Sequence, residues 1–313
     1  MFKKKGEEFL SWENLIYIAD FLQAGVEKHI SLLGGEPTLH PAFNDFVLYL
    51  LERNFQITVF TSGIMEQGML EEATSLYRDL PTETLSFVCN VNDPEKTNAS
   101  VAEKESIARF FLAFGPRVCP GFNIYRKDFE LDFLFKYINE FGLKRTLRIG
   151  LAHPIPQFAT NYVSLGDLES VIQRLFSYTP MFEAFRVKPG LDCGFPLCRF
   201  SDAHLSWLYR YTGGKSHFGC GAVVDIGPDM SVWPCFPLSE SNRKSLFDFD
   251  SWRQVHDYYS RFHQVVRTEV GGIFEECDDC QLREDGVCNG GCIAHNMAQF
   301  HQEAPLRVKE VYL

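Results

Sequence analysis

Helical and strand-like segments alternate along the first half of the chain. Ser11 can cap a helix whose apolar residues recur at helical spacing from Trp12 to Leu22, and a short apolar run follows it. Strands alternating with helices of ten to fifteen residues indicate a parallel sheet with right-handed crossovers. The predicted strands are 29–33, 56–60, 84–89, 117–124 and 145–151, and the predicted helices between and after them are about 41–53, 66–78, 99–114, 129–141 and 165–178.

Composition limits the classes of protein to which the chain can belong. The 313 residues are 45% hydrophobic, enough for a large core with a smaller module attached. A net charge of −11 without clustered Lys and Arg argues against nucleic-acid binding. No apolar stretch is long enough to span a bilayer, and the N-terminus lacks the apolar core of a signal peptide. We therefore expect a cytoplasmic protein without membrane partners.

Cysteines gather in the last part of the chain. The final four follow the spacing Cys277-x2-Cys280-x7-Cys288-x3-Cys292, which suits two thiolate pairs at one metal site. Cys220 and Cys235 bracket a predicted hairpin at 222–233, and a helix is predicted over about 251–266. We expect two domains, 1–182 and 183–313, the second metal-dependent. Its candidate ligands are Cys193, Cys198, Cys220, Cys235, Cys277, Cys280, Cys288 and Cys292.

A glycine-rich segment follows the first predicted strand. Gly34-Gly35-Glu36-Pro37 lies where a parallel strand ends, the edge at which such sheets bind ligands. The glycines permit close approach of the backbone, Glu36 can accept from an ammonium group, and Pro37 stiffens the exit.

This segment, with Thr61-Ser62-Gly63 after the next strand, resembles the radical S-adenosylmethionine (radical SAM) family. The resemblance implies a partial (β/α) barrel, an α/β fold that here lacks its first strand, and a cysteine-rich C-terminal domain with a β-hairpin. It also implies that Gly34, Gly35, Glu36 and Pro37 contact the methionyl amine of S-adenosylmethionine and that Thr61, Ser62 and Gly63 line the same pocket. Candidates for the ribose and carboxylate contacts are Asn90, Asn123 and Arg148.

The cysteine module resembles the SPASM-type auxiliary-cluster domain of peptide-modifying members of that family. The resemblance implies one or two auxiliary [4Fe-4S] clusters, although thiolate ligands suit Zn²⁺ as well. Local grouping joins Cys193, Cys198, Cys220 and Cys235 and leaves the last four together. The family's interleaving would instead send Cys292 to the hairpin site, with an upstream cysteine or His295 completing the other site. Met230 stands where the family has glycine, and the middle gap is seven residues rather than five.

The family's catalytic Cys-x3-Cys-x2-Cys segment is absent from these 313 residues. Two interpretations follow: an N-terminally shortened form of an enzyme, which we favour because Gly34 to Pro37 are intact, or a degenerate member. The resemblance implies that an intact form would generate a 5′-deoxyadenosyl radical and modify a peptide or protein, with an electron donor such as flavodoxin or ferredoxin. The alternatives are a non-catalytic iron–sulfur protein that binds peptides or relays electrons, and a zinc-stabilised scaffold.

Overall fold

A computed structural model describes residues 9–94, 96–155, 161–216, 218–240 and 242–303. The chain divides into two compact units. The first comprises Met1–Asn123, Glu130–Ile149 and Tyr178–Gly190, and the second comprises Ile124–Phe129, Gly150–Ser177 and Leu191–Leu313. The domain boundary predicted between residues 182 and 183 stays a prediction.

The first unit is built on a six-stranded sheet in the order β1-β2-β3-β4-β5-β6. The registers of β1 on β2, β2 on β3 and β3 on β4 are parallel, so the predicted α/β class is confirmed. The sixth strand was not predicted, because Pro189 and Gly190 in a four-residue segment resemble a loop. The strands are β1 (His29–Leu32), β2 (Gln56–Thr61), β3 (Leu85–Asn90), β4 (Val118–Ile124), β5 (Thr146–Leu151) and β6 (Lys188–Leu191).

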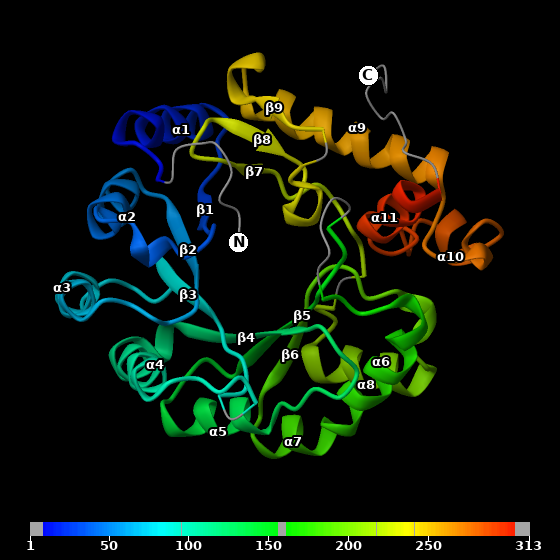
Figure 1. Ribbon diagram of the computed structural model, residues 1–313, viewed down its shortest axis with the longest axis horizontal. Helices are drawn as coiled ribbons and strands as arrows, with labels where there is room; N and C mark the ends of the chain where they lie inside the picture. The colour runs from blue at the N-terminus through cyan, green and yellow to red at the C-terminus, as the bar shows by residue number, and fades with distance from the viewer. Residues whose placement is uncertain (1–8, 95, 156–160, 217, 241, 304–313) are drawn as a thin grey trace. The chain divides into compact units, whose positions relative to one another are not determined.

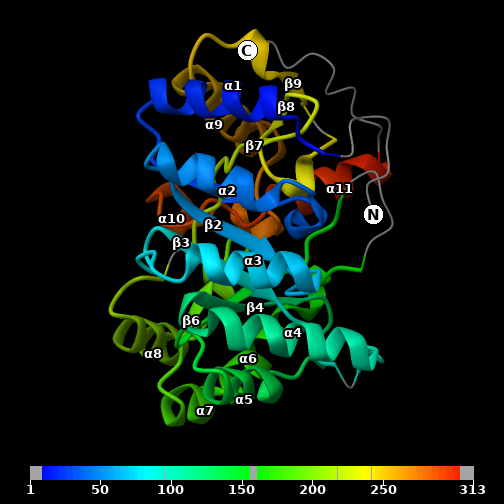
Figure 2. The ribbon, with the colours of Figure 1, turned by 90° about the vertical axis from the view of Figure 1, so that its left-hand side faces the viewer.

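Helices connect these strands and cover one face of the sheet, as Figure 1 shows for α2 to α5. Figure 2 faces this layer, in which α1, α2, α3 and α4 follow one another in chain order. Local signals set their starts: the Ser11 side chain accepts from the Asn14 amide, and Ser100 and Glu103 form a capping box. The helices of this unit are α1 (Trp12–Ala24), α2 (Phe43–Glu52), α3 (Gln67–Tyr77), α4 (Val101–Phe114), α5 (Asp132–Glu140) and α7 (Thr179–Ala184).

Aromatic side chains fill the space between this sheet and α4. Phe87 of β3 meets Phe110 edge-on with ring centroids 5.2 Å apart, and Phe114 lies 4.8 Å from Phe87. All three rings are buried, so they fix how α4 lies on the sheet.

The second unit contains a small antiparallel sheet and the cysteine module. Asp225 pairs with Trp233 and Ile226 with Val232, which confirms the predicted hairpin, and a third strand joins it. Helix α11 packs against α9 through an apolar cluster that includes Phe262, Val266 and Cys292. No described helix is both long and apolar enough to cross a membrane. The elements are β7 (Asp225–Ile226), β8 (Ser231–Trp233), β9 (Lys244–Ser245), α6 (Leu168–Ser177), α8 (Asp202–Thr212), α9 (Trp252–Val270), α10 (Gln281–Glu284) and α11 (Ile293–Glu303).

Candidate cofactor and metal sites

Glu36, just after β1, is held by side chains from the end of β2. Its Oε1 accepts from the Thr61 hydroxyl at 2.7 Å and from the Thr38 hydroxyl at 2.8 Å. Its Oε2 accepts from the Ser62 amide at 2.7 Å and from the Ser62 hydroxyl at 2.6 Å. The structure therefore brings together Glu36 and the Thr61-Ser62-Gly63 loop, which are 25 residues apart in sequence, and fixes the orientation of the carboxylate.

Glycine is required at two positions in the loops that follow β1 and β2. Gly34 has a φ of +146° and Gly63 a φ of +76°, a region that side chains with a Cβ rarely adopt. A Cβ on Gly63 would also lie 2.9 Å from the Cys89 sulfur. Burial, with the nearby Glu36 charge, raises the pKa of Cys89. This thiol packs beneath the loop.

The three polar candidates on the later strands also meet. Nη1 of Arg148 in β5 donates to Oδ1 of Asn90 in β3 and of Asn123 in β4, both at 3.4 Å. Gly121 makes room for this arrangement, since a Cβ there would lie 2.4 Å from the Asn90 oxygen. Arg148 also lies over the Phe60 ring at 5.5 Å.

Together these residues form a polar row across β1 to β5, from Glu36 just after β1 to Arg148 within β5. One end offers carboxylate oxygens, which suit an ammonium group, and the other offers a guanidinium, which suits a carboxylate. Ser62, Asn90 and Arg148 are partly exposed and Asn123 is exposed, so a ligand can reach them. The row has the polarity to bind a small zwitterion.

In the second unit, one set of thiols gathers around the hairpin. We define the hairpin group as Cys193, Cys220, Cys235 and Cys292. The nearby Cys292 thiol, then burial, raise the pKa of Cys220 to about 12. Burial, then the nearby thiols of Cys292, Cys220 and Cys193, raise the pKa of Cys235.

A second set lies in the loops around α10. We define the loop group as Cys198, Cys277 and Cys288. Burial raises the pKa of Cys198, Arg199 beside it lowers that pKa, and the nearby Cys277 and Cys288 raise it. The Gly290 amide donates to the Cys288 sulfur at 3.4 Å. Cys280, the remaining candidate, is partly exposed at the N-cap of α10.

The two groups interleave along the sequence. Cys193 and Cys198 go to different groups, and so do Cys288 and Cys292. This arrangement agrees with the second of the two partitions left open by the sequence, with Cys198 as the upstream cysteine. His295 lies instead against His153 and Tyr162, with ring centroids 5.5 Å and 5.7 Å away.

The chemistry of both groups fits an iron–sulfur cluster. Sulfur ligands select Fe–S clusters or Zn²⁺, and a bound cation would offset the burial and the nearby thiols that raise the pKa values of Cys198, Cys220 and Cys235. Within the described residues, no three His, Cys, Asp or Glu side chains converge closely enough to hold a single metal ion. A four-iron cubane binds each thiolate to a different iron, so its ligands do not have to converge on one point.

Histidines beside the hairpin group were not assigned a role from sequence. His153 fits against Gly194, where a Cβ would lie 2.2 Å from its ring, and burial lowers the pKa of His153. His263 in α9 is buried beside Cys220. The available signal was periodicity, since His263 follows Tyr259 by one turn on the face of α9 that buries Val255 and Val266.

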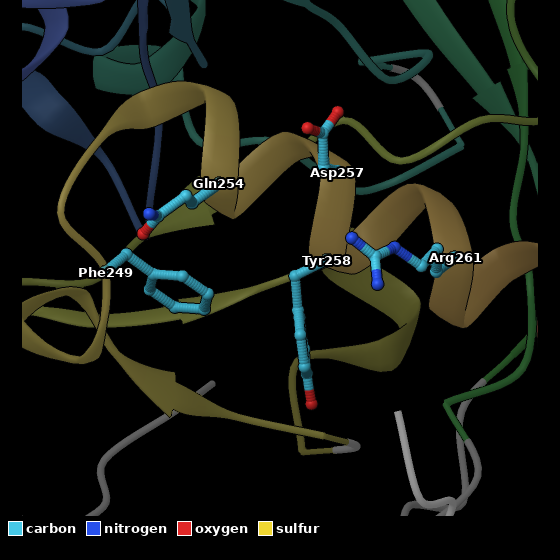
Figure 3. Close-up of a pocket in the computed structure, with 5 residues that line it drawn as sticks. All are labelled: Phe249, Gln254, Asp257, Tyr258 and Arg261. Carbon is cyan, nitrogen blue, oxygen red and sulfur yellow. The ribbon is translucent and has the colours of Figure 1, made fainter.

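A shallow pocket also lies on the second unit, away from the cysteines in sequence. Figure 3 shows Phe249 before α9 and, on the helix itself, Gln254, Asp257, Tyr258 and Arg261. The Tyr258 hydroxyl donates to Asn242 at 2.9 Å and its ring meets Phe249 edge-on at 5.6 Å. These contacts account for the side chains as part of the packing between the hairpin sheet and α9.

Comparisons with known proteins place the fold. No family profile matches the chain. It is 23% identical over 277 residues to the tungsten-containing aldehyde ferredoxin oxidoreductase cofactor-modifying protein of Pyrococcus furiosus, covering 80% of this chain and 72% of that one. The crystal structure of Streptococcus suis SuiB bound to S-adenosylmethionine aligns with a TM-score of 0.64 at 14% identity, covering 93% of this chain and 68% of that one. A second crystal structure of Streptococcus suis SuiB aligns with a TM-score of 0.58 at 16% identity, covering 90% of this chain and 66% of that one. The chain therefore has an α/β fold similar to that of SuiB.

Proposed function

We propose that this chain is a radical SAM-type iron–sulfur protein whose hairpin and loop groups each hold an auxiliary [4Fe-4S] cluster. The observation that carries the proposal is the gathering of cysteines that are far apart in sequence into two interleaved groups, in which Cys277, Cys288 and Cys292 are buried. Crowded thiols with raised pKa values are costly to ionise without a cation, and coordination by iron supplies one. Cys280 would complete the loop group.

The polar row would bind S-adenosylmethionine. Glu36 would accept from the methionyl ammonium, and Arg148 would meet the carboxylate, with Asn90 and Asn123 toward the ribose. The fold is similar to that of SuiB, which was crystallised bound to S-adenosylmethionine. Gly34 and Gly63 would let the ligand approach the backbone.

A further cluster, when bound next to S-adenosylmethionine, supplies the electron that cleaves the sulfonium in radical SAM chemistry. The Cys-x3-Cys-x2-Cys segment that holds such a cluster does not occur in these 313 residues. We therefore propose that this chain binds S-adenosylmethionine without cleaving it by itself. A protein with this fold that also carried such a segment would act on a peptide or protein substrate and take electrons from a flavodoxin or ferredoxin.

Anaerobic isolation with adequate iron tests the proposal. We expect about eight irons with matching labile sulfide per chain, the brown colour of [4Fe-4S] clusters, and S-adenosylmethionine binding by equilibrium dialysis without release of 5′-deoxyadenosine under dithionite. Colourless protein without labile sulfide would overturn it.

Zinc without labile sulfide would support the zinc-scaffold alternative. Clusters without binding of S-adenosylmethionine would support a non-catalytic electron-relay protein. The second outcome would leave the metal assignment intact and remove only the role of the polar row.

A further inference from the structure

His263 is buried without a hydrogen-bond partner. It lies on α9 with 4% of its surface exposed, and neither ring nitrogen makes a hydrogen bond with a described group. An imidazole in an apolar interior carries at least one N–H, and leaving that donor unpaired is unfavourable. The arrangement indicates that something else accepts from the ring.

The polar group beside His263 is the thiol of Cys220. The imidazole and this thiol lie within interaction distance of each other. The Phe262 ring lies 6.1 Å from the His263 ring, and Phe262 belongs with Val266 and Met297 to a buried apolar cluster of the same unit. A sulfur of the hairpin group is therefore the acceptor within reach.

Helix α9 also fixes the backbone of Cys220. Arg267, one turn after His263, donates to the carbonyls of Cys220 and Asn289. Two successive turns of the helix thus contact the same cysteine: Arg267 holds its main chain, and His263 faces its sulfur.

We propose that His263 donates an N–H hydrogen bond to the Cys220 sulfur in the iron-loaded hairpin group and thereby raises the reduction potential of that cluster. The inference rests on the proposed function. A hydrogen bond to a ligating sulfur stabilises negative charge, and the reduced cluster carries one more negative charge than the oxidised cluster. The donor therefore favours reduction. Such partners of the ligands are among the means by which proteins tune metal sites.

The loop group provides an internal comparison. The groups placed beside its sulfurs are the Arg199 cation near Cys198 and the Gly290 amide at Cys288. A change at His263 should therefore shift the potential of one cluster and leave the other where it was.

The experiment is an anaerobic redox titration monitored by electron paramagnetic resonance, with iron and sulfide measured on each sample. We expect His263→Leu to weaken reduction of one cluster about tenfold, which is about 59 mV for one electron, and His263→Gln to restore most of the difference through its own N–H. The control is His256→Leu, because His256 lies exposed on the same helix and should change neither potential. Wild-type potentials in an iron-replete His263→Leu variant would overturn the inference.

A second measurement, in which His263 itself is kept, covers the case in which a His263 variant fails to retain its cluster. With ¹⁵N-labelled histidine, pulsed resonance of the reduced protein should show one weakly coupled ring nitrogen, which persists in His153→Gln. A strong coupling, the sign of direct ligation to iron, or no coupled nitrogen would refute the hydrogen bond. Absence of iron and sulfide from the wild-type protein would refute the proposed function instead, so the two failures are distinguishable.

Discussion

Glu36 is the residue on which the proposed S-adenosylmethionine site depends. Its oxygens accept from Thr38, Thr61 and Ser62, so the carboxylate is oriented before any ligand arrives. We expect Glu36→Gln to weaken S-adenosylmethionine binding at least tenfold, because the charge opposite the ammonium is lost and an amide N–H would face the donors of Thr61 or Ser62. Equilibrium dialysis measures the change. Glu71→Gln on exposed α3 is the control, and equal affinity in the two variants would remove Glu36 from the site.

His295 makes stability depend on pH. Burial, with a smaller effect from nearby His153, lowers the pKa of His295 from 6.5 to about 3. Below pH 6.5 the unfolded chain takes up a proton that the folded chain does not, so the free energy of unfolding falls as the pH falls from 6.5 toward 3. Between pH 7 and pH 5.5 we expect the wild type to lose about 1 kcal/mol more than His295→Phe. Urea unfolding at both values checks this, and parallel losses in the two proteins would contradict it.

At the scale of elements, helices α1 to α5 and strands β1 to β5 were predictable from hydrophobic periodicity, and side-chain caps mark the starts of α1, α3 and α4. Ser100 with Glu103 and Ser11 with Asn14 are examples of signals confined to four residues. Strand β6 could not be found in this way, because its place in the sheet comes from pairing rather than from its own composition.

The hairpin turn shows how an unfavourable residue is retained. Met230 stands where the resemblance expects glycine, and it adopts a φ of +61°. The conformation costs about 1 kcal/mol for a residue with a Cβ, but the side chain is 3% exposed, and its burial contributes about 2 to 3 kcal/mol. Packing therefore outweighs strain.

Two substitutions at Met230 separate the contribution of side-chain packing from the cost of backbone strain. We expect Met230→Gly to lower the free energy of unfolding by about 2 kcal/mol, since it loses the packing and relieves the strain. Met230→Ala should cost about 1 kcal/mol more, because it loses most of the packing and keeps the strain. Urea denaturation of both variants gives the order. If Met230→Ala destabilises the protein less than Met230→Gly does, backbone strain at this turn is negligible.

At the scale of the whole molecule, the candidate cysteines could be identified from their spacing, but their partition could not. Which thiols meet depends on the path of the loops between 193 and 292, and sequence distance does not reveal it: the thiols near Cys235 include Cys193 and Cys292, and those near Cys198 include Cys277 and Cys288. His263 was missed for a related reason, since a single histidine on the apolar face of a helix is typical of core packing.

Paired cysteine substitutions test this partition. Cys235→Ser, Cys292→Ser and Cys277→Ser should each remove one cluster and about half of the iron. Because Cys235 and Cys292 belong to the hairpin group, the double variant should lose no more iron than either single variant. Cys277 belongs to the loop group, so Cys277→Ser with Cys292→Ser should lose nearly all of it.

Grouping by sequence proximity reverses both expectations, because it joins Cys277 with Cys292 and separates Cys292 from Cys235. Iron and labile sulfide per chain after anaerobic isolation therefore discriminate between the two arrangements without a substrate or an activity. Cys119→Ser is the matched control: its thiol donates to the Thr146 carbonyl at 3.2 Å in the first unit, a bond that a serine hydroxyl can replace, so this variant should keep all of its iron.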